Sequence, residues 1–393
     1  MIQVIPVETK QQKRLFIDFP HSLYAENPYY VPELYLAQYD LLTPGKHPFY
    51  NHSSTQLFLA YKDQQLVGRI AAIWNVNHNA FNEVQEGQWG FFDSINDQEV
   101  ANALFKVAKD WVKAKGGNNI IGPINLTTND TCGLLIEGFD SPPVAMMPYN
   151  FAYYPDLVTN AGFQKKIDLR AYLVMENKAS KRSVLLLEKL EERLNRSGIK
   201  IRQMNLKDFK NETEKIREIY NKAWDKNLGF VPFTEDEFNY AAKEMKMIVD
   251  PRYALLAEKD GKVIGFALGI PDINQILIKI KRGRLLPTGI FKLLFGLKKV
   301  NLIRVLMLGV LDEYRKLGIE ACLYGRIIKN SGDGFTVKGA ECSWMLDTNY
   351  MMNHAIEQIN GELYSGSTET TCAVISGNCK IYAGQYSICR VFH

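Results

Sequence analysis

The sequence contains little cysteine, and its cysteines are not spaced as metal ligands. Only 6 of the 393 residues are cysteine, and no two of them form a CxxC pair. A disulfide-stapled scaffold is therefore excluded, and neither a zinc ribbon nor a thioredoxin-type redox site is indicated. We expect no metal site in this protein.

Long apolar runs and a strong excess of one charge are also missing. No window reaches about 18 uninterrupted apolar residues, so no membrane-spanning helix is predicted. The N-terminal segment lacks the basic-then-apolar order of a signal peptide, and we therefore expect a cytoplasmic protein. The 47 basic and 43 acidic residues give a net charge of +4. This balance is unlike that of a general nucleic-acid binder, so no nucleic acid is expected as a partner.

Acidic residues are absent from one long stretch, between Asp272 and Asp312. The stretch holds eight basic residues, which are Lys279, Lys281, Arg282, Arg284, Lys292, Lys298, Lys299 and Arg304. It also includes residues 285–300, an apolar segment interrupted by a single lysine and a Lys-Lys pair. Two interpretations stay open. Residues 276–300 contact a membrane surface peripherally, or the stretch is a basic insertion that packs on the second half of the chain and lines a groove for an anionic ligand.

One pattern of elements occurs twice along the chain. Residues 56–74 and 253–270 each read as two alternating strands joined by a polar turn. In both halves a strand, a helix, a further strand and a short helix follow in the same order. Between the halves, residues 180–198 have the leucine spacing of an amphipathic helix. We predict an α/β protein with a mixed sheet, made of one duplicated unit: domains at 1–178 and 198–393 with a linker helix at 179–197.

The segment 305–327 has the pattern of a phosphate-binding turn. An apolar strand ends near Val310 and is followed by RKLGIE, residues 315–320, at the start of a helix. Basic residues at a helix N-terminus oppose the macrodipole, which indicates an anion at that end. Gly318 allows close approach of the backbone, whose N–H groups can then bind a phosphate. The alternative is an ordinary basic surface turn.

At these residues the chain resembles the GNAT superfamily of acyl-CoA N-acyltransferases, whose signature is Arg/Gln-x-x-Gly-x-Gly/Ala. The last signature position is Glu320 here. The resemblance implies two tandem GNAT-like domains, with acetyl-CoA or a longer acyl-CoA as co-substrate. It also implies a cofactor site made of Leu308, Gly309, Val310, Arg315, Lys316, Leu317, Gly318, Ile319 and Asn349. The tandem arrangement is similar to that of bacterial proteins of the YghO type.

The matching segment of the first half lacks this signature. It reads Ser94-Ile95-Asn96-Asp97-Gln98-Glu99, with no glycine and with acids that would repel a phosphate. Asn96 or Asp97 is an ordinary helix N-cap. We therefore expect the first half to be a degenerate copy that binds no CoA.

Acyl transfer to an amine requires a base and a proton donor. The candidate bases are Glu313, Glu341 and Asp347, and Tyr314 is a candidate donor. In GNAT enzymes the donor is often a Tyr about seven residues after the Asn that opens the last helix. Here that position is Ile356.

A long polar and aromatic segment, residues 122–163, is typical either of a binding site or of an interface. Its candidate substrate-pocket residues are Asn125, Thr128, Asn129, Tyr149 and Tyr153, with Trp344 as a further pocket wall. The C-terminal tail, residues 365–393, holds three cysteines, and a final hairpin is predicted around Ala383-Gly384.

Three functions follow as hypotheses. The first is an acyl-CoA-dependent N-acyltransferase that acts on a small-molecule amine or a peptide. The second is a non-catalytic GNAT-like protein that senses a ligand or binds a partner. The third is an enzyme working at a membrane surface or a Fem-type aminoacyl transferase.

Overall fold

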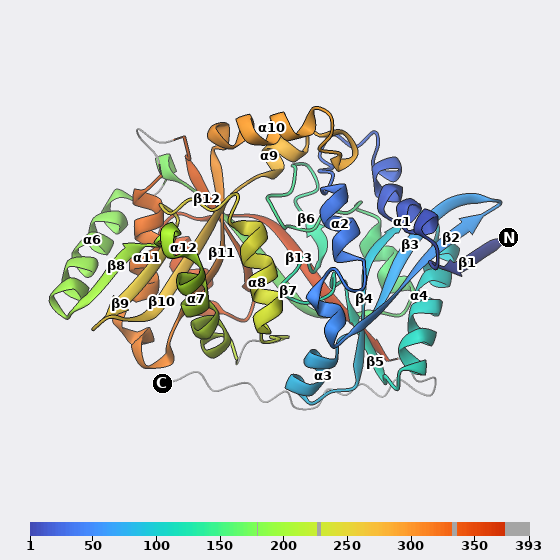
Figure 1. Cartoon of the computed structure of the whole chain (residues 1–393), viewed down its shortest axis with the longest axis horizontal. Coiled ribbons are helices and arrows are strands. Elements are labelled where there is room, and N and C mark those ends of the chain that lie inside the picture. Colours follow the sequence, from blue (N-terminus) through green and yellow to red (C-terminus); the bar gives the residue numbers. More distant parts are fainter. Residues whose placement is uncertain (179, 226–228, 332–335, 374–393) are drawn as a thin grey trace.

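The computed structural model describes residues 1–178, 180–225, 229–331 and 336–373. They form a mixed α/β fold, as predicted, in which one large sheet runs through the molecule with helices on its faces (Figure 1). The hairpin predicted around Ala383-Gly384 lies outside the described residues. Within the described part of the chain, no helix is both long and apolar enough to cross a membrane.

The N-terminal half, residues 1–178, has the following main elements in chain order. They are β1 (Ile2–Pro6), α1 (Lys10–Leu23), α2 (Tyr35–Leu41), η1 (Pro48–Asn51), β2 (Ser54–Lys62), β3 (Gln65–Trp74), α3 (Val76–Asn82), β4 (Glu86–Ser94), α4 (Gln98–Ala114), β5 (Asn119–Gly122), β6 (Leu134–Glu137), α5 (Tyr154–Asn160) and β7 (Gln164–Met175).

Helix α6 (Lys181–Arg196) connects this half to the C-terminal half, which begins near residue 198. Its main elements are β8 (Ile199–Gln203), α7 (Phe209–Ala223), α8 (Glu235–Met245), β9 (Ala254–Lys259), β10 (Lys262–Pro271), α9 (Asn274–Leu277), α10 (Gly289–Gly296), β11 (Leu302–Val310), η6 (Asp312–Leu317), α11 (Ile319–Lys329), β12 (Gly339–Leu346), α12 (Tyr350–Gln358) and β13 (Glu362–Ala373).

The two predicted hairpins are present and have the same turn chemistry. β2 and β3 are joined through Asp63 and Gln64, and β9 and β10 through Asp260 and Gly261. All four turn residues have positive φ, which is the conformation that a two-residue turn between twisted antiparallel strands requires. Each half then continues with a strand, a helix and a parallel strand.

The halves exchange their last strands. The sheet order is β1-β2-β3-β4-β5-β13-β7-β12-β11-β10-β9-β8, so β13 of the C-terminal half lies between β5 and β7 of the N-terminal half. In turn, β7 pairs with β12. Figure 1 shows β7 and β13 at the middle of the molecule. Each half therefore completes the sheet of the other, because β5 and β12 each have one neighbouring strand from their own half and the second from the other half.

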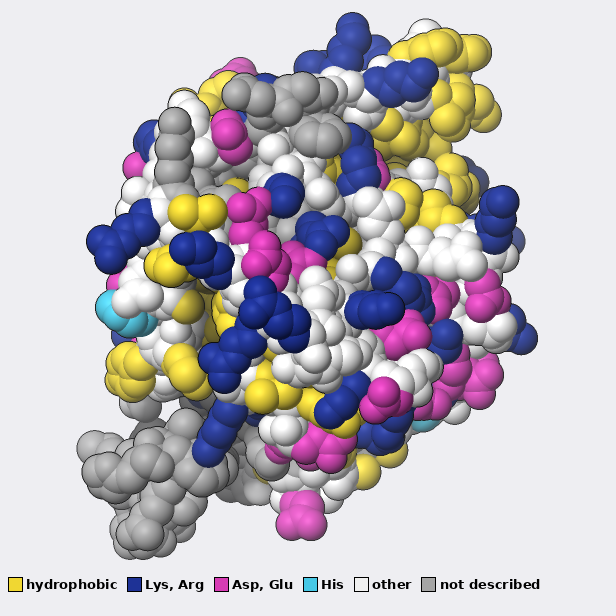
Figure 2. Space-filling model, turned by 90° about the vertical axis from the view of Figure 1, so that its left-hand side faces the viewer, with side chains coloured by type: hydrophobic (Ala, Val, Ile, Leu, Met, Phe, Trp, Pro, Cys, Tyr) yellow, Lys and Arg dark blue, Asp and Glu magenta, His cyan; other side chains and the backbone are white. Residues whose placement is uncertain are grey.

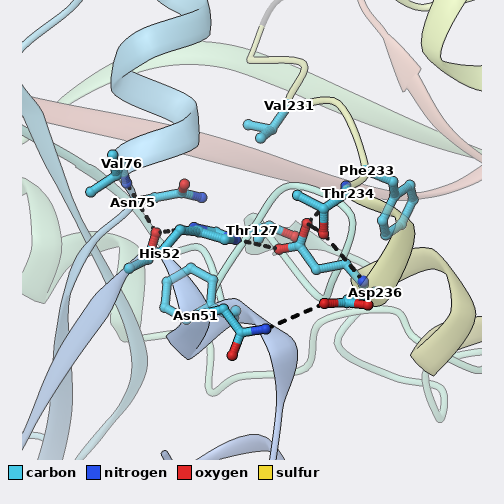
Figure 3. A network of polar contacts seen from close by, with 12 residues as sticks. Asn51, His52, Asn75, Val76, Thr127, Val231, Phe233, Thr234 and Asp236 are labelled. Atoms are coloured by element: carbon cyan, nitrogen blue, oxygen red, sulfur yellow. Dashed lines mark hydrogen bonds and ion pairs between the residues drawn. The ribbon is translucent and has the colours of Figure 1, made fainter.

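Polar contacts also join the halves away from the sheet. His52 lies 3.1 Å, from Nε2 to Oε1, from the carboxylate of Glu237 on α8, and the side chain of Asn51 donates to Asp236. Figure 3 shows Asn51 and His52, at the end of η1, pointing toward Thr234 and Asp236 at the start of α8. Thr234 and Glu237 form a capping box at that helix start, so the histidine binds a carboxylate that is already held in place.

Candidate active site at the diverging strands

The candidate site begins where two parallel strands separate. β11 and β12 pair only from Leu302 opposite Gly339 to Val305 opposite Cys342. Beyond this point β11 stays with β10 as far as Val310, whereas β12 stays with β7 as far as Leu346. The two strands diverge, and backbone groups of β11 from Leu306 onward face no strand on the β12 side.

The turn after β11 leads into the N-terminus of a helix. Gly318 has φ +81° and is the N-cap of α11, and the described part of the chain supplies no side-chain cap there. A Cβ on Gly318 would come within 2.8 Å of Leu190 on α6. The N-cap itself therefore leaves the first-turn N–H groups of α11 to other acceptors, and the glycine lets the backbone approach closely.

Glu320 lies in this first turn and faces its own backbone N–H. Burial raises the pKa of its carboxyl, while this backbone hydrogen bond and the nearby Arg315 lower it. A carboxylate here is favoured by the helix dipole. It would, however, repel a phosphate at the same helix end.

The carbonyls at the end of β11 contact helix α7. The indole Nε1 of Trp224 donates to the Leu308 carbonyl at 2.9 Å. Arg315 donates to the carbonyls of Val310 and Ala223 and pairs with Asp312 at 3.1 Å. Since Ala223 ends α7, this cation lies at the negative end of the helix and joins it to β11.

An open cavity of about 210 Å³ adjoins this turn. Its lining includes Leu311, directly after β11, and three lysines, Lys215, Lys222 and Lys262, together with Glu218. The lysines outnumber the single acid, so the cavity suits an anionic ligand.

The four catalytic candidates lie in different surroundings. Asp347 directly follows β12, and its backbone N–H donates to the Asp168 carbonyl. Glu313 is exposed in η6 and Tyr314 is half-buried there, with Lys259 5.7 Å from its ring. Glu341 lies on β12 and is 0% exposed. From Arg304, opposite Glu341, to Val310 at the turn, β11 spans about 20 Å. Glu341 is therefore separated from Glu313 and Tyr314 along the strand.

Glu341 forms a buried pair with Arg304, which is 1% exposed, with 3.6 Å between Oε2 and Nε. Arg304 also donates to the Ala145 carbonyl and lies over the ring of Trp344. Burial raises the pKa of Glu341 and Arg304 opposes this. The side chains of Ser343 and Tyr364 also lower the pKa of Glu341 as hydrogen-bond donors, but burial outweighs them. A buried carboxylate with a raised pKa is suited to take a proton.

The predicted substrate-pocket residues fall into three groups. Asn125 and Tyr153 bond to backbone of β4, at Phe91 and Ser94. Thr128 and Asn129 join the halves by donating to the carbonyls of Gly229 and Val231.

Tyr149 and Trp344 lie nearer the buried pair. Tyr149 lines a small cavity with Met147 and Tyr364, and Tyr364 is one of the groups that influence the pKa of Glu341. Asn349, predicted for the cofactor site, is the N-cap of α12 and accepts from Met352 N–H.

Sequence reasoning missed Arg304, Trp224 and Tyr364 as parts of the site. Arg304 was counted only with the basic stretch. A signal was available, because a cation inside LIRVLMLGV and an acid inside GAECSWML both interrupt apolar strands. Within the described residues, no group of three or more His, Cys, Asp or Glu side chains could hold a metal ion.

Comparison with solved structures defines the class of the fold. A tandem GNAT protein from the clavulanic acid biosynthesis pathway, solved without acetyl-CoA, matches 96% of this chain and 100% of its own with a TM-score of 0.55 at 10% identity. The glucosamine N-acetyltransferase region of a fungal β-N-acetylglucosaminidase matches 95% of this chain and 38% of its own, with a TM-score of 0.56 at 11% identity. The chain has the tandem GNAT fold, and the resemblance seen in the sequence is confirmed.

Two relatives place the chain more narrowly. YghO of Escherichia coli K12 is 36% identical over 360 residues, which are 90% of this chain and 91% of YghO. The bacterial ceramide synthase of Caulobacter vibrioides is 34% identical over 372 residues, 92% of this chain and 95% of that protein. The chain belongs to the tandem GNAT family of these two proteins. No general protein-family model matches it.

Proposed function

We propose that this protein is an acyl-CoA-dependent N-acyltransferase whose acyl donor binds in the C-terminal half. The observation that carries the proposal is the divergence of β11 and β12 beside the uncapped start of α11. The diphosphate of CoA accepts from the first-turn N–H groups around Gly318, and a further phosphate lies by the lysine-lined cavity. The site works in the cytoplasm, where acyl-CoA is available.

The pantetheine arm runs along the end of β11 toward the point where the strands part. The carbonyl of Leu308, which the Trp224 indole now occupies, is the acceptor for a pantetheine amide N–H. Binding therefore requires the indole to move aside. This requirement and the carboxylate of Glu320 lower the affinity for CoA without removing the site.

The amine nitrogen attacks the thioester carbonyl, the C–S bond breaks, and the leaving CoA thiolate takes the second proton of the nitrogen, so that an amide and the CoA thiol form. Before attack, the ammonium group must lose a proton, and we assign this proton to Glu341. Arg304 is a positioning residue, since it holds the carboxylate and limits the rise of its pKa.

The acceptor class that we propose is a long-chain amino alcohol. One relative of this chain, at 34% identity over 92% of its length, is a bacterial ceramide synthase, and a ceramide is the N-acyl derivative of such an amino alcohol. Apolar side chains also lie near Tyr364, which influences the pKa of Glu341, because Pro142, Pro143 and Met147 line a small cavity with it.

Calorimetry with CoA, acetyl-CoA and palmitoyl-CoA, followed by mass spectrometry of products from sphinganine, tests the proposal. We expect micromolar binding of acyl-CoA and an amide product. Glu341→Gln should lower kcat about 10²–10⁴-fold with little change in the CoA dissociation constant. Glu313→Gln should change kcat less than about twofold, because an exposed carboxylate is not placed to act as the base. Absence of CoA binding at millimolar concentration would overturn the proposal.

Glu341→Gln leaves Arg304 buried without a counter-charge, which costs about 3–5 kcal/mol of stability. The double variant Arg304→Met/Glu341→Gln removes both charges and should fold. If it folds, binds CoA and turns over at the wild-type rate, Glu341 is not the base.

A second candidate function is a CoA-responsive sensor without turnover. Glu320 at the helix start and Trp224 on the Leu308 carbonyl favour this function. Both lower the affinity for CoA, and the indole has to move before CoA can bind. Binding of CoA without an amide product from any tested amine would support this second function.

A further inference from the structure

Helix α10 presents an exposed apolar face. Leu286, Phe291, Leu294 and Phe295 are 80%, 58%, 53% and 72% exposed. The last three lie at i, i+3 and i+4 and therefore share one side of the helix. On its opposite side, Gly289 and Leu293 are buried. The helix is thus apolar on both sides, but only one side is covered.

The covered side fixes the helix on the body of the protein. It packs in a small core of its own, made of Val31, Ile276, Leu277, Ile280, Leu293 and Val300. Gly296 lies so close to Ile276 that a Cβ would come within 2.8 Å of that side chain. Arg284, just before the helix, pairs with Asp18 at 2.9 Å and stacks over the ring of Tyr35. The outer side chains are therefore held outward by a packed base.

Basic side chains surround this apolar face. Six exposed residues besides Arg284 contribute, namely Lys279, Lys281, Arg282, Lys292, Lys298 and Lys299. No acidic residue occurs between Asp272 and Asp312. Figure 2 shows hydrophobic side chains next to Lys and Arg side chains at the upper edge of the molecule, where Figure 1 has α10.

We propose that this face, Leu286 to Lys299, docks on an anionic lipid bilayer. Phe291, Leu294 and Phe295 enter the boundary between head groups and acyl chains, as the apolar face of an interfacial helix does. The lysines bind anionic head groups. A second copy of the chain is disfavoured as occupant, since two such basic faces repel each other. Nucleic acid would leave the apolar side chains without a partner.

The docking face and the proposed CoA site lie at opposite ends of β11. The insertion with α9 and α10 is tied to the first residue of the strand by the hydrogen bond from Asp272 N–H to the Leu302 carbonyl, 2.9 Å long. The strand then runs about 30 Å to the turn before Gly318. A lipid amine from the bilayer and a CoA from solution would thus approach the diverging strands from two different ends.

One loop connects the docking insertion to the buried pair. Ala145 N–H donates to Asp272 at the start of the insertion, and the Asn274 side chain donates to the Pro143 carbonyl. The same loop accepts from Arg304 through the Ala145 carbonyl at 2.7 Å. The inference rests on the proposed function for the identity of the lipid substrate, but the docking itself does not depend on catalysis.

Co-sedimentation of the full chain with vesicles tests the docking. We expect strong binding to phosphatidylcholine vesicles that contain about 30% phosphatidylglycerol and weak binding to pure phosphatidylcholine, with a decrease as salt rises. Lys298→Glu/Lys299→Glu should lower the partition coefficient at least roughly thirtyfold. Phe291→Ser/Phe295→Ser should abolish binding. The matched control Leu185→Ser/Leu186→Ser removes two exposed leucines of α6 and should bind as wild type.

The outcomes separate this inference from the proposed function. Phe291→Ser/Phe295→Ser should keep its unfolding midpoint and CoA affinity, lose turnover of a vesicle-borne amine and keep turnover of the same amine in detergent. Wild-type protein that binds CoA but no anionic vesicle overturns the docking alone. Wild-type protein that binds vesicles but no CoA overturns the proposed function and leaves the docking in place. Equal sedimentation of wild type and both α10 variants also refutes the docking.

Discussion

The two halves contain the same pair of diverging parallel strands, and they differ in what lies at the divergence. In the N-terminal half β4 and β5 pair from Glu86 to Gln88 and then separate. In the C-terminal half β11 and β12 do so after Val305. The shared geometry comes from the duplicated fold. The residues between the diverging strands therefore determine whether a half can bind a ligand there or is blocked by its own chain.

The N-terminal opening is filled by its own chain. The N–H of Ile124 donates to the Trp89 carbonyl at 2.8 Å, and Asn125 accepts from Phe91 N–H at 2.8 Å. A Cβ on Gly90 would lie 2.1 Å from the Ile124 carbonyl, so the two backbones touch. This packing supports the proposal that the first half binds no CoA, because backbone groups that would meet pantetheine already have partners.

The two helix starts differ in the same sense. Asp97 caps α4 by accepting from Glu99 and Val100 N–H at 2.9 and 3.4 Å. At α11 the N-cap is Gly318, for which the described residues give no side-chain cap. In the N-terminal half the carboxylate of Asp97 thus binds the first-turn N–H groups of α4. In the C-terminal half the corresponding groups of α11 are left to a ligand or to Glu320.

Among variants that test the difference between the two halves, Gly318→Val should have the largest effect. The residue has φ +81°, and an added Cβ would meet Leu190. We expect a loss of about 1–3 kcal/mol in the free energy of unfolding from the strained backbone, and at least a tenfold loss of CoA affinity because the turn moves. Thermal unfolding and calorimetry measure the two.

Gly198→Val is the matched control. Gly198 has the same φ of +81°, but nothing lies within 4 Å of its added Cβ. It should show the backbone strain without the change in CoA affinity. An equal loss of affinity in both variants would mean that the turn at Gly318 has no special part in binding.

Asp97→Ala tests the filled copy. Loss of this N-cap, which also pairs with Lys62 at 2.6 Å, should lower the free energy of unfolding by about 1–2 kcal/mol. The helix start becomes free of its carboxylate, but the strands beside it stay filled. We therefore expect calorimetry to show one CoA per chain as before. A second CoA bound by the variant would show that the cap alone separates the two copies.

Glu320→Gln sharpens the comparison from the other side. Burial raises the pKa of this carboxyl, so it takes up a proton as pH falls through the raised value and then no longer repels the diphosphate. Wild-type affinity for CoA should therefore increase as pH decreases. The variant should bind about fivefold more tightly at pH 8 and lose this pH dependence. If both proteins give the same pH profile in calorimetry, Glu320 does not face the ligand.

The fold could be predicted from the sequence as far as local patterns reach. Both hairpins, the strand that ends at Val310 and the turn through Gly318 follow from alternation, turn residues and a glycine at a helix start. The exchange of β7 and β13 could not be predicted, because strand order in a sheet depends on contacts far apart in sequence. The local sequence of β13 does not indicate whether this strand pairs with β5 of the other half or with β12 of its own half.

The same reason limits the prediction of the site. The sequence indicates Glu341 as a candidate base near a strand end, but its buried partner Arg304 lies 37 positions earlier, within the basic stretch. Asn125, Thr128 and Asn129 were grouped by composition, whereas the structure uses them at the filled opening and between the halves. The residue types of Asn125, Thr128 and Asn129 indicated that these side chains make hydrogen bonds, but not with which part of the protein.

The smallest expected effect belongs to Trp224→Phe. In the C-terminal half, the indole N–H donates to the Leu308 carbonyl between the diverging strands. This contact can be removed by one substitution, unlike the backbone contacts that fill the N-terminal opening. Its loss costs about 1 kcal/mol of stability and frees the carbonyl, so CoA should bind about threefold more tightly. Trp111→Phe on α4, far along the chain from this site, should leave the affinity unchanged. If Trp224→Phe weakens CoA binding in calorimetry, the indole contacts the ligand instead of giving way to it.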